Sequence, residues 1–273
     1  MAAPQTKNAA PSPPSGPPEL SVVVPVLDEA ENLRPLIEEI AAALDDGPEF
    51  EIVYVDDCSG DGTHARLAAL AAEHPRLRWL RHRSPCGQSA AIWSGVEAAR
   101  APLIATLDGD GQNDPADIPK LLARFAAERA GDDGPMITGQ RAKRRDSRLK
   151  WISSRIANRV RAGLLADQTP DTGCGLKVFP RAAFLAMPRF DHMHRFLPAL
   201  MMRGGGRVVS VAVAHRPRGA GASKYGVLDR LWIGIVDLLG VMWLKRRPLN
   251  PDIADDGKDD ASGSAPGPRS HRP

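Results

Sequence analysis

The stretch LIATLDGDGQNDP (103–115) is a short apolar run that stops at a string of carboxylates, and it decides the fold class when similar runs are compared with it. Two such runs precede it, LSVVVPV (20–26) and EIVYVDD (51–57), and both are followed by acidic residues or end in them. Continuous apolar runs of this length are typical of strands buried on both faces of a parallel sheet. We therefore expect an α/β domain whose functional residues lie at the carboxyl edge of the sheet.

Helical patterns separate these runs, as the crossover connections of a parallel sheet require. The second half of the chain is less regular, and we find no internal repeat. The expected elements are, in order, strand 20–26, a helix that starts at 28–29 and reaches 44, strand 51–57, a helix through 67–71, strand 77–80, helix 88–100, strand 103–108, helix 118–128, strand 136–139, a basic helix over 147–165, a turn and short strand over 173–179, helix 193–203, strand 208–216 and helix 227–244.

Both ends of the chain lack an apolar period. Residues 1–19 are mostly Ala, Pro, Ser and Gly, and residues 248–273 are rich in Pro, Asp, Gly and Ser. Such segments bury too little apolar surface to offset the entropy of ordering the chain. We expect two disordered tails around one domain that spans residues 20–247.

The composition argues against several classes of protein. The net charge is only +3 and aromatic residues make up 5% of the chain, so neither a strong phosphate-binding field nor base-stacking surfaces are indicated, and we expect no nucleic-acid partner. The three cysteines (Cys58, Cys86 and Cys174) have no CxxC spacing and are expected to be reduced thiols. No apolar core of signal-peptide length is present near the N-terminus, so we expect a cytoplasmic protein.

Carboxylates at the end of the 103–108 strand predict a metal site. Side chains alternate along an extended backbone, so Asp108, Asp110 and Gln112 would face the same way and present oxygen atoms to one cation. Oxygen ligands of this kind suit Mg²⁺ or Mn²⁺, and the phosphates of a nucleotide would complete the coordination shell.

Three other interpretations of this motif compete. Asp-Gly pairs are common in turns that bind nothing. An EF-hand loop that starts at Asp108 would need Gly and Glu where this chain has Asn113 and Pro119. A phosphatase-type aspartyl nucleophile would be expected after the first strand, not the fourth. The position at the ligand-binding edge of the sheet favours metal binding.

Two further acidic spots follow neighbouring strands. Glu29 follows the first strand and Asp57 ends the second, and either carboxylate can accept hydrogen bonds from a ribose or a base. The alternatives are structural, since Asp28 and Glu29 also favour a helix N-terminus and Asp61 can cap a helix. Neither a Gly-rich dinucleotide fingerprint nor a Walker A sequence is present, so we expect carboxylates and a metal to hold the nucleotide.

Taken together, PVLDEAENL (25–33), VDDCSGDGT (55–63), LDGDGQNDP (107–115) and TGQR (138–141) resemble family 2 glycosyltransferases with the GT-A fold. More narrowly, the chain resembles the dolichol-phosphate mannosyltransferase and bacterial polyprenyl-phosphate glycosyltransferase branch. The segments DTGCGLKVF (171–179), HRFLPAL (194–200) and HRPRGAGASKYG (215–226) are similar to the acceptor-side segments of that branch. The resemblance covers about residues 20–247.

The resemblance implies roles for the matching residues. Asp108, Asp110 and Gln112 would hold the metal, and Pro25, Glu29, Asp57 and Asp108 would contact the nucleotide sugar. Asp110, Arg141 and Arg218 would act in catalysis, with Arg141 at the donor diphosphate. Ser223 and Lys224, with Arg216 or Arg218, would bind the acceptor phosphate. Lys150 is expected to join them for a different reason, because the run 141–150 has six basic residues and a single acid and would attract anionic phosphate. The chain departs from the pattern at Gly111, where a larger apolar residue is common, and at Ala222, where a polar one is common.

The implied chemistry is the transfer of a sugar from a UDP- or GDP-sugar to a polyprenyl phosphate. A lipid monophosphate has a second pKa of about 6, so it is anionic near neutral pH and can attack without a general base. Positioning and charge neutralisation are then the work of the protein. Attack opposite the diphosphate would invert the anomeric centre.

Membrane contact is expected from the segment VLDRLWIGIVDLLGVMWLKRR (227–247). Its apolar portion is shorter than the ~20 residues of a span, and Asp237 interrupts it. Two interpretations stay open, a helix in the membrane interface and a buried core helix. With no further span, we expect peripheral attachment to the cytoplasmic face of a membrane.

Two other functions compete with the lipid-phosphate acceptor. One is a transferase of the same fold that acts on a growing glycan, and the other is a nucleotide-sugar binding module without activity. The sequence does not distinguish UDP from GDP, the sugar, or dolichol from a bacterial polyprenol.

Overall fold

The computed structural model describes residues 16–129, 134–141, 163, 165, 169–217 and 227–247, and for 227–233 the backbone alone. Both expected tails, apart from residues 16–19, and the expected basic helix over 147–165, apart from residues 163 and 165, lie outside these ranges. The strands are β1 (Leu20–Val26), β2 (Phe50–Asp56), β3 (Leu77–Arg81), β4 (Leu103–Thr106), β5 (Met136–Arg141), β6 (Lys177–Pro180) and β7 (Val208–Val213). The helices are α1 (Leu33–Ala43), α2 (Thr63–Glu73), α3 (Gln88–Ala98), α4 (Ile118–Glu128), α6 (Arg181–Leu185), α7 (Leu197–Arg203) and α8 (Val227–Lys245), with 3₁₀ turns η1 (Pro115–Asp117) and η2 (Met193–Arg195).

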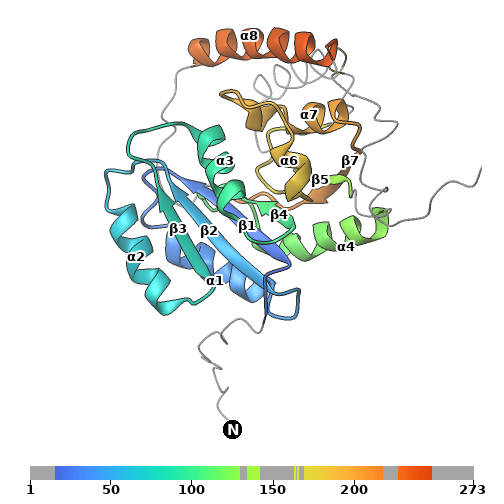
Figure 1. The fold of residues 1–273 in the computed structure, drawn as a ribbon. Coiled ribbons are helices and arrows are strands. Elements are labelled where there is room, and N and C mark those ends of the chain that lie inside the picture. The colour runs from blue at the N-terminus through green and yellow to red at the C-terminus, as the bar shows by residue number, and fades with distance from the viewer. Residues whose placement is uncertain are drawn as a thin grey trace, which may run out of the picture.

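The described strands form one seven-stranded sheet in the order β3-β2-β1-β4-β6-β5-β7 (Figure 1). Strands β3, β2, β1 and β4 are parallel, and β7 is parallel to β5. Strand β6 runs antiparallel to both of its neighbours, β4 and β5. The expected α/β class with a mostly parallel sheet is confirmed. The insertion of β6 between β4 and β5 brings the 171–176 loop next to the end of β4.

Helices cover both faces of the sheet, and each face has its own core (Figure 1). Alternate residues of β1 separate the two cores, because Val22 and Val24 belong to one and Val23 to the other. The first core packs against α1, α2 and α4, and the second against α3, α6 and α7. Helix α3 approaches β1 so closely that a Cβ added at Gly95 would lie 2.4 Å from Val23 Cγ1. The sheet is therefore a rigid support for the loops at its edge.

Helix α8 lies at the edge of the molecule, over α7 (Figure 1). Val241 is 1% exposed and belongs to the second core. The Arg203 guanidinium donates to the carbonyl oxygens of Leu244 and Arg247 at 2.9 and 3.0 Å, which satisfies the open end of the helix. None of the helices in the described parts of the chain has both the length and the apolar character needed to cross a bilayer.

Two of the sequence predictions about helices are corrected. The first helix begins at Leu33, not at Asp28-Glu29, because residues 27–32 form a turn in which Asp28 has a φ of 55°. The expected helix over 193–203 is divided into η2 and α7. Phe196 interrupts it with a φ of −117°, and Pro198 lies in the first turn of α7, a position that suits a residue without an N–H group.

Candidate active site

The loop after β4 carries the predicted metal ligands, but its backbone is not extended. Residues 109 and 110 form a turn, and Gly111 has a φ of +71°, which favours glycine. The side chains of this loop therefore do not alternate as in a strand, and that prediction is wrong. Asp108 and Asp110 are nevertheless close enough for the charge of Asp110 to raise the pKa of Asp108. Gln112 is tied to the same loop, because its backbone N–H donates to Asp110 Oδ1 at 3.1 Å.

The carboxylate of Asp108 is held from two sides. The side-chain amide of Gln88, the first residue of α3, donates to Asp108 Oδ1 at 2.9 Å. On the other side lies Gly175, where an added Cβ would be only 2.2 Å from Asp108 Oδ2. The hydroxyl of Thr106 donates to the Gly175 carbonyl at 2.7 Å and fixes this loop against the end of β4. Asp108 therefore has one well-defined orientation, which a metal ligand needs.

Buried charge surrounds the Asp108 carboxylate. Burial and then the nearby Asp110 raise the pKa of Asp108, while Lys177, Arg141 and the Gln88 hydrogen bond act in the opposite direction. Lys177 is 4% exposed, donates to the Cys174 carbonyl, and has a pKa lowered by its burial. Two adjacent carboxylates with all-oxygen donors suit a hard divalent cation. The residues present therefore fit the Mg²⁺ or Mn²⁺ that the sequence predicts.

Arg141 ends β5 and is bound to Asp171 of the loop before β6. Its Nε and Nη2 atoms lie 2.6 and 2.7 Å from the two carboxylate oxygens of Asp171, a bidentate arrangement with both side chains largely buried. This ion pair fixes the direction of the guanidinium, which contributes to the electrostatic environment of Asp108. The position agrees with the predicted donor-phosphate role, which stays a prediction.

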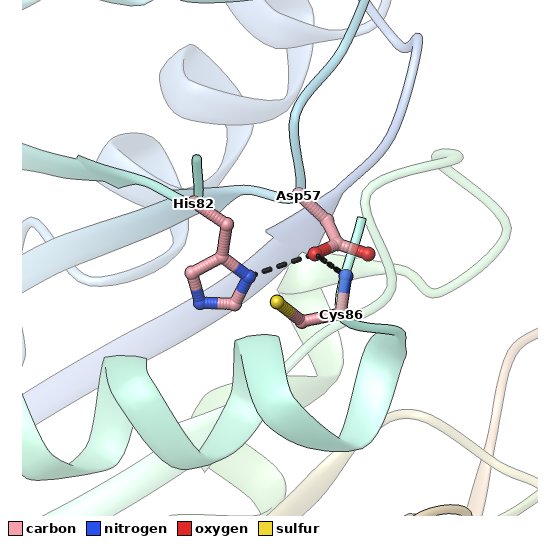
Figure 2. A group of neighbouring side chains, drawn as sticks. All are labelled: Asp57, His82 and Cys86. Atoms are coloured by element: carbon pink, nitrogen blue, oxygen red, sulfur yellow. Dashed lines mark hydrogen bonds and ion pairs between the residues drawn. The ribbon is translucent and has the colours of Figure 1, made fainter. Parts of the chain in front are cut away.

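Asp57, at the end of β2, is 4% exposed and holds the loop that leads into α3 (Figure 2). Its Oδ1 accepts from the Cys86 backbone N–H at 2.8 Å and lies 2.7 Å from His82 Nδ1, and its Oδ2 accepts from the Gly87 N–H at 2.8 Å. These bonds give Asp57 a structural function that the sequence did not reveal. Its contact with a nucleoside stays a prediction.

The turn after β1 meets the same edge of the sheet. Pro25 and Val26 end β1, and an added Cβ at Gly109 would lie 3.0 Å from the Pro25 carbonyl oxygen. The Glu29 carboxylate accepts from the Asn32 side-chain amide at 2.5 Å. Asp61 has a structural role, since it accepts from the Ala30 N–H at 3.1 Å, but the N-cap of α2 is Gly62 and not Asp61. Pro25 and Glu29 are thus near the strand ends, and their nucleotide contacts stay predictions.

Residues 21–186 of the chain match the family described as Glycosyl transferase family 2, and this match covers more than half of the sequence. The chain belongs to glycosyl transferase family 2. As an enzyme of this family, it is a glycosyltransferase, and the Asp108 loop lies within the matched region.

Two curated relatives are similar over most of this glycosyltransferase. The dodecaprenyl-phosphate galacturonate synthase of Rhizobium johnstonii is 37% identical over 238 residues, which cover 85% of this chain and 69% of the relative. The undecaprenyl-phosphate 4-deoxy-4-formamido-L-arabinose transferase of Aeromonas hydrophila is 32% identical over 211 residues, which cover 77% of this chain and 63% of the relative. The resemblance to the polyprenyl-phosphate branch of the family is confirmed.

Solved structures share the fold. Glucosyl-3-phosphoglycerate synthase of Mycobacterium tuberculosis, in complex with Mn²⁺, UDP and phosphoglyceric acid, superposes with a TM-score of 0.62 at 16% identity, over 85% of this chain and 80% of that one. The same enzyme with Mg²⁺ and UDP gives a TM-score of 0.60 at 16% identity, over 84% and 79% of the two chains. At this identity the likeness establishes the GT-A fold alone.

On the acceptor side, Arg216 is the one predicted residue that the described part of the chain contains. Its guanidinium pairs with Glu39 at 2.7 Å and with Asp114 at 2.6 Å, and its N–H donates to the Gln112 carbonyl at 3.0 Å. These contacts clamp the segment after β7 onto the loop after β4 that carries the predicted metal ligands, and phosphate binding by Arg216 stays a prediction. Lys150, Arg218, Ser223 and Lys224 lie outside the described residues.

Sequence reasoning missed the side chains that orient the predicted ligands. Gln88, Asp171, Gly175 and Lys177 surround Asp108 and Arg141, yet each lies 20 or more positions from them in the sequence. Asp171, Gly175 and Lys177 belong to one motif. That motif, DTGCGLKVF (171–179), was expected on the acceptor side, whereas the structure packs it against Asp108 at the end of β4. The Asp171, Gly173 and Gly175 pattern of this motif was the signal in the sequence that could have indicated its place at the site.

Proposed function

We propose that this enzyme is an inverting glycosyltransferase that moves a sugar from a UDP- or GDP-sugar to a polyprenyl phosphate, with Mg²⁺ or Mn²⁺ bound by Asp108, Asp110 and Gln112. The observation that carries the proposal is the Asp108 carboxylate, oriented by Gln88 and Gly175 beside Asp110 at the ligand-binding edge of the sheet. Both curated relatives have names that specify a polyprenyl phosphate as the molecule they glycosylate, which supports this class of acceptor.

A bound divalent cation would neutralise negative charge that develops on the departing nucleoside diphosphate. The charged side chains of the site are already positioned for this step. Asp108 and Asp110 would hold the cation, and Arg141, directed by Asp171, lies in the same region as a fixed positive charge. Because these groups are positioned before the substrate binds, little reorganisation is needed during the reaction.

A phosphate nucleophile explains why the site needs no general base from the protein. Two of the described histidines near the site have other partners, since His82 is bound to Asp57 and Ser94, and His194 to Ser89. Burial lowers the pKa of His194 to about 3, so that it is neutral at working pH. A lipid monophosphate is already anionic at neutral pH and can attack the anomeric carbon without a base from the protein.

The outer face of α8 supports peripheral attachment at the cytoplasmic face of a membrane. Val236, Leu239 and Trp243 are 53%, 58% and 59% exposed, while Val241 faces the core. Lys245, Arg246 and Arg247 follow this apolar face, and basic residues near a bilayer surface each add about 1 kcal/mol of attraction to anionic lipids. Of the two interpretations left open by the sequence, these exposures favour the interfacial helix, whose inner side is packed and whose outer side would enter the headgroup region.

The test is an assay with purified full-length protein, Mg²⁺ or Mn²⁺, undecaprenyl phosphate and a panel of radiolabelled UDP- and GDP-sugars. We expect label from one donor to enter the organic phase, and we expect EDTA or Asp110→Asn to abolish the transfer. Thr106 and Asn113 are not predicted ligands, but they lie too near the site to serve as controls. The matched control is therefore a remote carboxylate on the surface, Asp46→Asn, which should keep the transfer.

The outcomes separate the proposal from its competitors. Transfer to a glycan acceptor but not to the lipid phosphate would replace the acceptor and keep the reaction class. Metal-dependent nucleotide binding without transfer from any donor to either acceptor would favour a binding module and refute the proposed activity.

A further inference from the structure

Three side chains of different segments meet beside the β2 end of the sheet. Asp57 follows β2, His82 follows β3, and Cys86 lies two residues before the first residue of α3 (Figure 2). One ligand atom of each, the Asp57 carboxylate oxygen, a His82 ring nitrogen and Cys86 Sγ, lie within 4.8 Å of one another. The Asp57 carboxylate is buried, whereas Cys86 is exposed, so the cluster is supported from inside and open to solvent on one side.

The donor atoms of this cluster differ in kind from those of the Asp108 loop. An imidazole, a thiol and a carboxylate are the ligands that Zn²⁺ takes, whereas Mg²⁺ and Mn²⁺ prefer oxygen alone. Zinc–ligand bonds of about 2.0–2.3 Å in a tetrahedron place donor atoms roughly 3.3–3.7 Å apart. The three donor atoms lie within 4.8 Å of one another, and the His82–Asp57 pair at 2.7 Å would have to open by roughly 0.6 Å on binding, while the exposed Cys86 side chain has room to move.

His82 has a partner that would hold it as a ligand. Its Nδ1 faces Asp57, and its Nε2 lies 3.0 Å from Ser94 Oγ. Cation binding would replace the His82–Asp57 hydrogen bond: the ring proton would lie on Nε2, where the imidazole donates to Ser94, and the Nδ1 lone pair would face the cation. Hydrogen bonds of this type to the second ring nitrogen are a regular feature of histidine ligands.

Cys86 needs only a side-chain rotation. Its thiol donates to the Ser84 carbonyl at 3.1 Å, and the side chain is exposed. Binding would break this hydrogen bond, release the thiol proton to solvent and form a sulfur–metal bond. The net charge of a Zn²⁺ ion with one thiolate, one carboxylate and a neutral imidazole is zero, which is favourable for a partly buried site.

We propose that Asp57, His82 and Cys86 form a second metal site, selective for Zn²⁺ or another thiophilic divalent cation and separate from the site at Asp108, Asp110 and Gln112. The fourth position of the tetrahedron faces solvent and is filled by water. A consequence rests on the proposed function: since Asp57 is also the predicted nucleoside contact, Zn²⁺ competes with the nucleotide-sugar donor and inhibits transfer.

The direct test uses Co²⁺ as a spectroscopic substitute for Zn²⁺ on the chelator-treated, full-length protein. Thiolate ligation gives a near-ultraviolet charge-transfer band, and tetrahedral Co²⁺ gives strong visible bands, neither of which an all-oxygen site produces. We expect both at one equivalent of Co²⁺ and their loss when Zn²⁺ is added. Cys86→Ser should remove the charge-transfer band and weaken Zn²⁺ binding by more than about tenfold.

Two control variants make the assignment specific. Cys58→Ser changes a thiol in the neighbouring loop that is not in the cluster, and it should keep the spectrum. Asp110→Asn alters the hard-cation site and should also keep it. Persistence of the charge-transfer band in Cys86→Ser, its absence from the wild type, or its loss in Asp110→Asn would each overturn the proposal.

The consequence for activity has its own measurement. With Mg²⁺ in excess, Zn²⁺ should raise the donor KM of the wild type and have a much smaller effect on the KM of Cys86→Ser. Equal Zn²⁺ sensitivity of the two proteins would show that the site does not control donor binding. Since the Co²⁺ spectrum needs no substrate, failure of the proposed glycosyltransferase activity and failure of the metal site are distinguishable.

Discussion

Gly175→Ala is a substitution that should impair catalysis and leave the fold intact. An added Cβ would lie 2.2 Å from Asp108 Oδ2, 2.3 Å from Cγ and 2.5 Å from Oδ1, whereas ordinary contact begins at 3.4 Å. Turning the carboxylate about the Cβ–Cγ bond does not relieve the overlap, because Cγ itself is too close. The side chain must change its χ1 angle, so the carboxylate moves by roughly 1 Å or more to restore normal contact.

This displacement should affect the metal site first. The carboxylate leaves the Gln88 amide, from which it accepts at 2.9 Å, and it leaves the position in which it would bind the cation. A misplacement of about 1 Å in a catalytic arrangement costs on the order of 100-fold in rate. We expect kcat/KM for sugar transfer to fall by about this factor, together with a higher Mg²⁺ concentration for half-maximal activity.

The folded state should tolerate the change, because the clash is with the end of a side chain and not with backbone. Thermal unfolding measured beside the activity checks this point. Gly204→Ala is the matched control, since its added Cβ would make only ordinary contacts, the closest at 3.5 Å to the Met201 carbonyl oxygen. If Gly175→Ala kept kcat/KM and the Mg²⁺ requirement within about threefold of the wild type, the observed Asp108 position would not be the catalytic one, and the reasoning would be refuted.

Three further predictions concern stability and membrane binding. Asp171→Ala leaves the largely buried Arg141 guanidinium without its bidentate partner and should lower the free energy of unfolding in urea by about 3 kcal/mol, whereas Glu73→Ala on the surface should change it little. His194 has a pKa lowered by burial to about 3, so only the unfolded chain binds its proton as the pH falls below about 6.5. The wild type should therefore lose about 2 kcal/mol more stability between pH 7.5 and 5 than His194→Gln, and equal losses would contradict the assignment. Leu239→Glu with Trp243→Glu removes exposed apolar surface from α8 and should weaken binding to anionic vesicles by at least about tenfold, with unchanged nucleotide affinity in solution.

Much of the fold could be predicted from the sequence because its signals are local. The strand 20–26 and the helix 118–128 have the expected bounds, since each is a continuous apolar or amphipathic segment with clear breaks at both ends. The antiparallel insertion of β6 between β4 and β5 was not predicted. Strand order depends on which segments pair across the sheet, and a four-residue strand carries no signal for its partners.

In the candidate site too, residues with a local sequence signal could be predicted, and residues placed by long-range contacts could not. Asp108 and Asp110 could be identified because they follow a buried strand directly, and their positions at the sheet edge agree with that prediction. Gln88 and Gly175 could not be identified, since their roles arise from contacts with a residue 20 or 67 positions away in the sequence (108 − 88 and 175 − 108). The expectation for the helix start at Asp28 was wrong because the turn there bonds to the 59–63 loop, as in the Asp28 N–H to Ser59 Oγ hydrogen bond of 2.9 Å.

Helices α3 and α8 are joined through short contacts of the 192–194 segment. Asp237 of α8 lies 3.2 Å from His192, and two residues further along the chain His194 is bound to Ser89 of α3 at 2.7 Å. If α8 rests on lipid, the height of the reacting centre above the bilayer is then a fixed dimension of the enzyme, since these described side chains hold α8 against the body of the domain. Such an enzyme would handle the phosphate end of its lipid at one set depth, and the number of isoprene units buried further down should matter little to the rate.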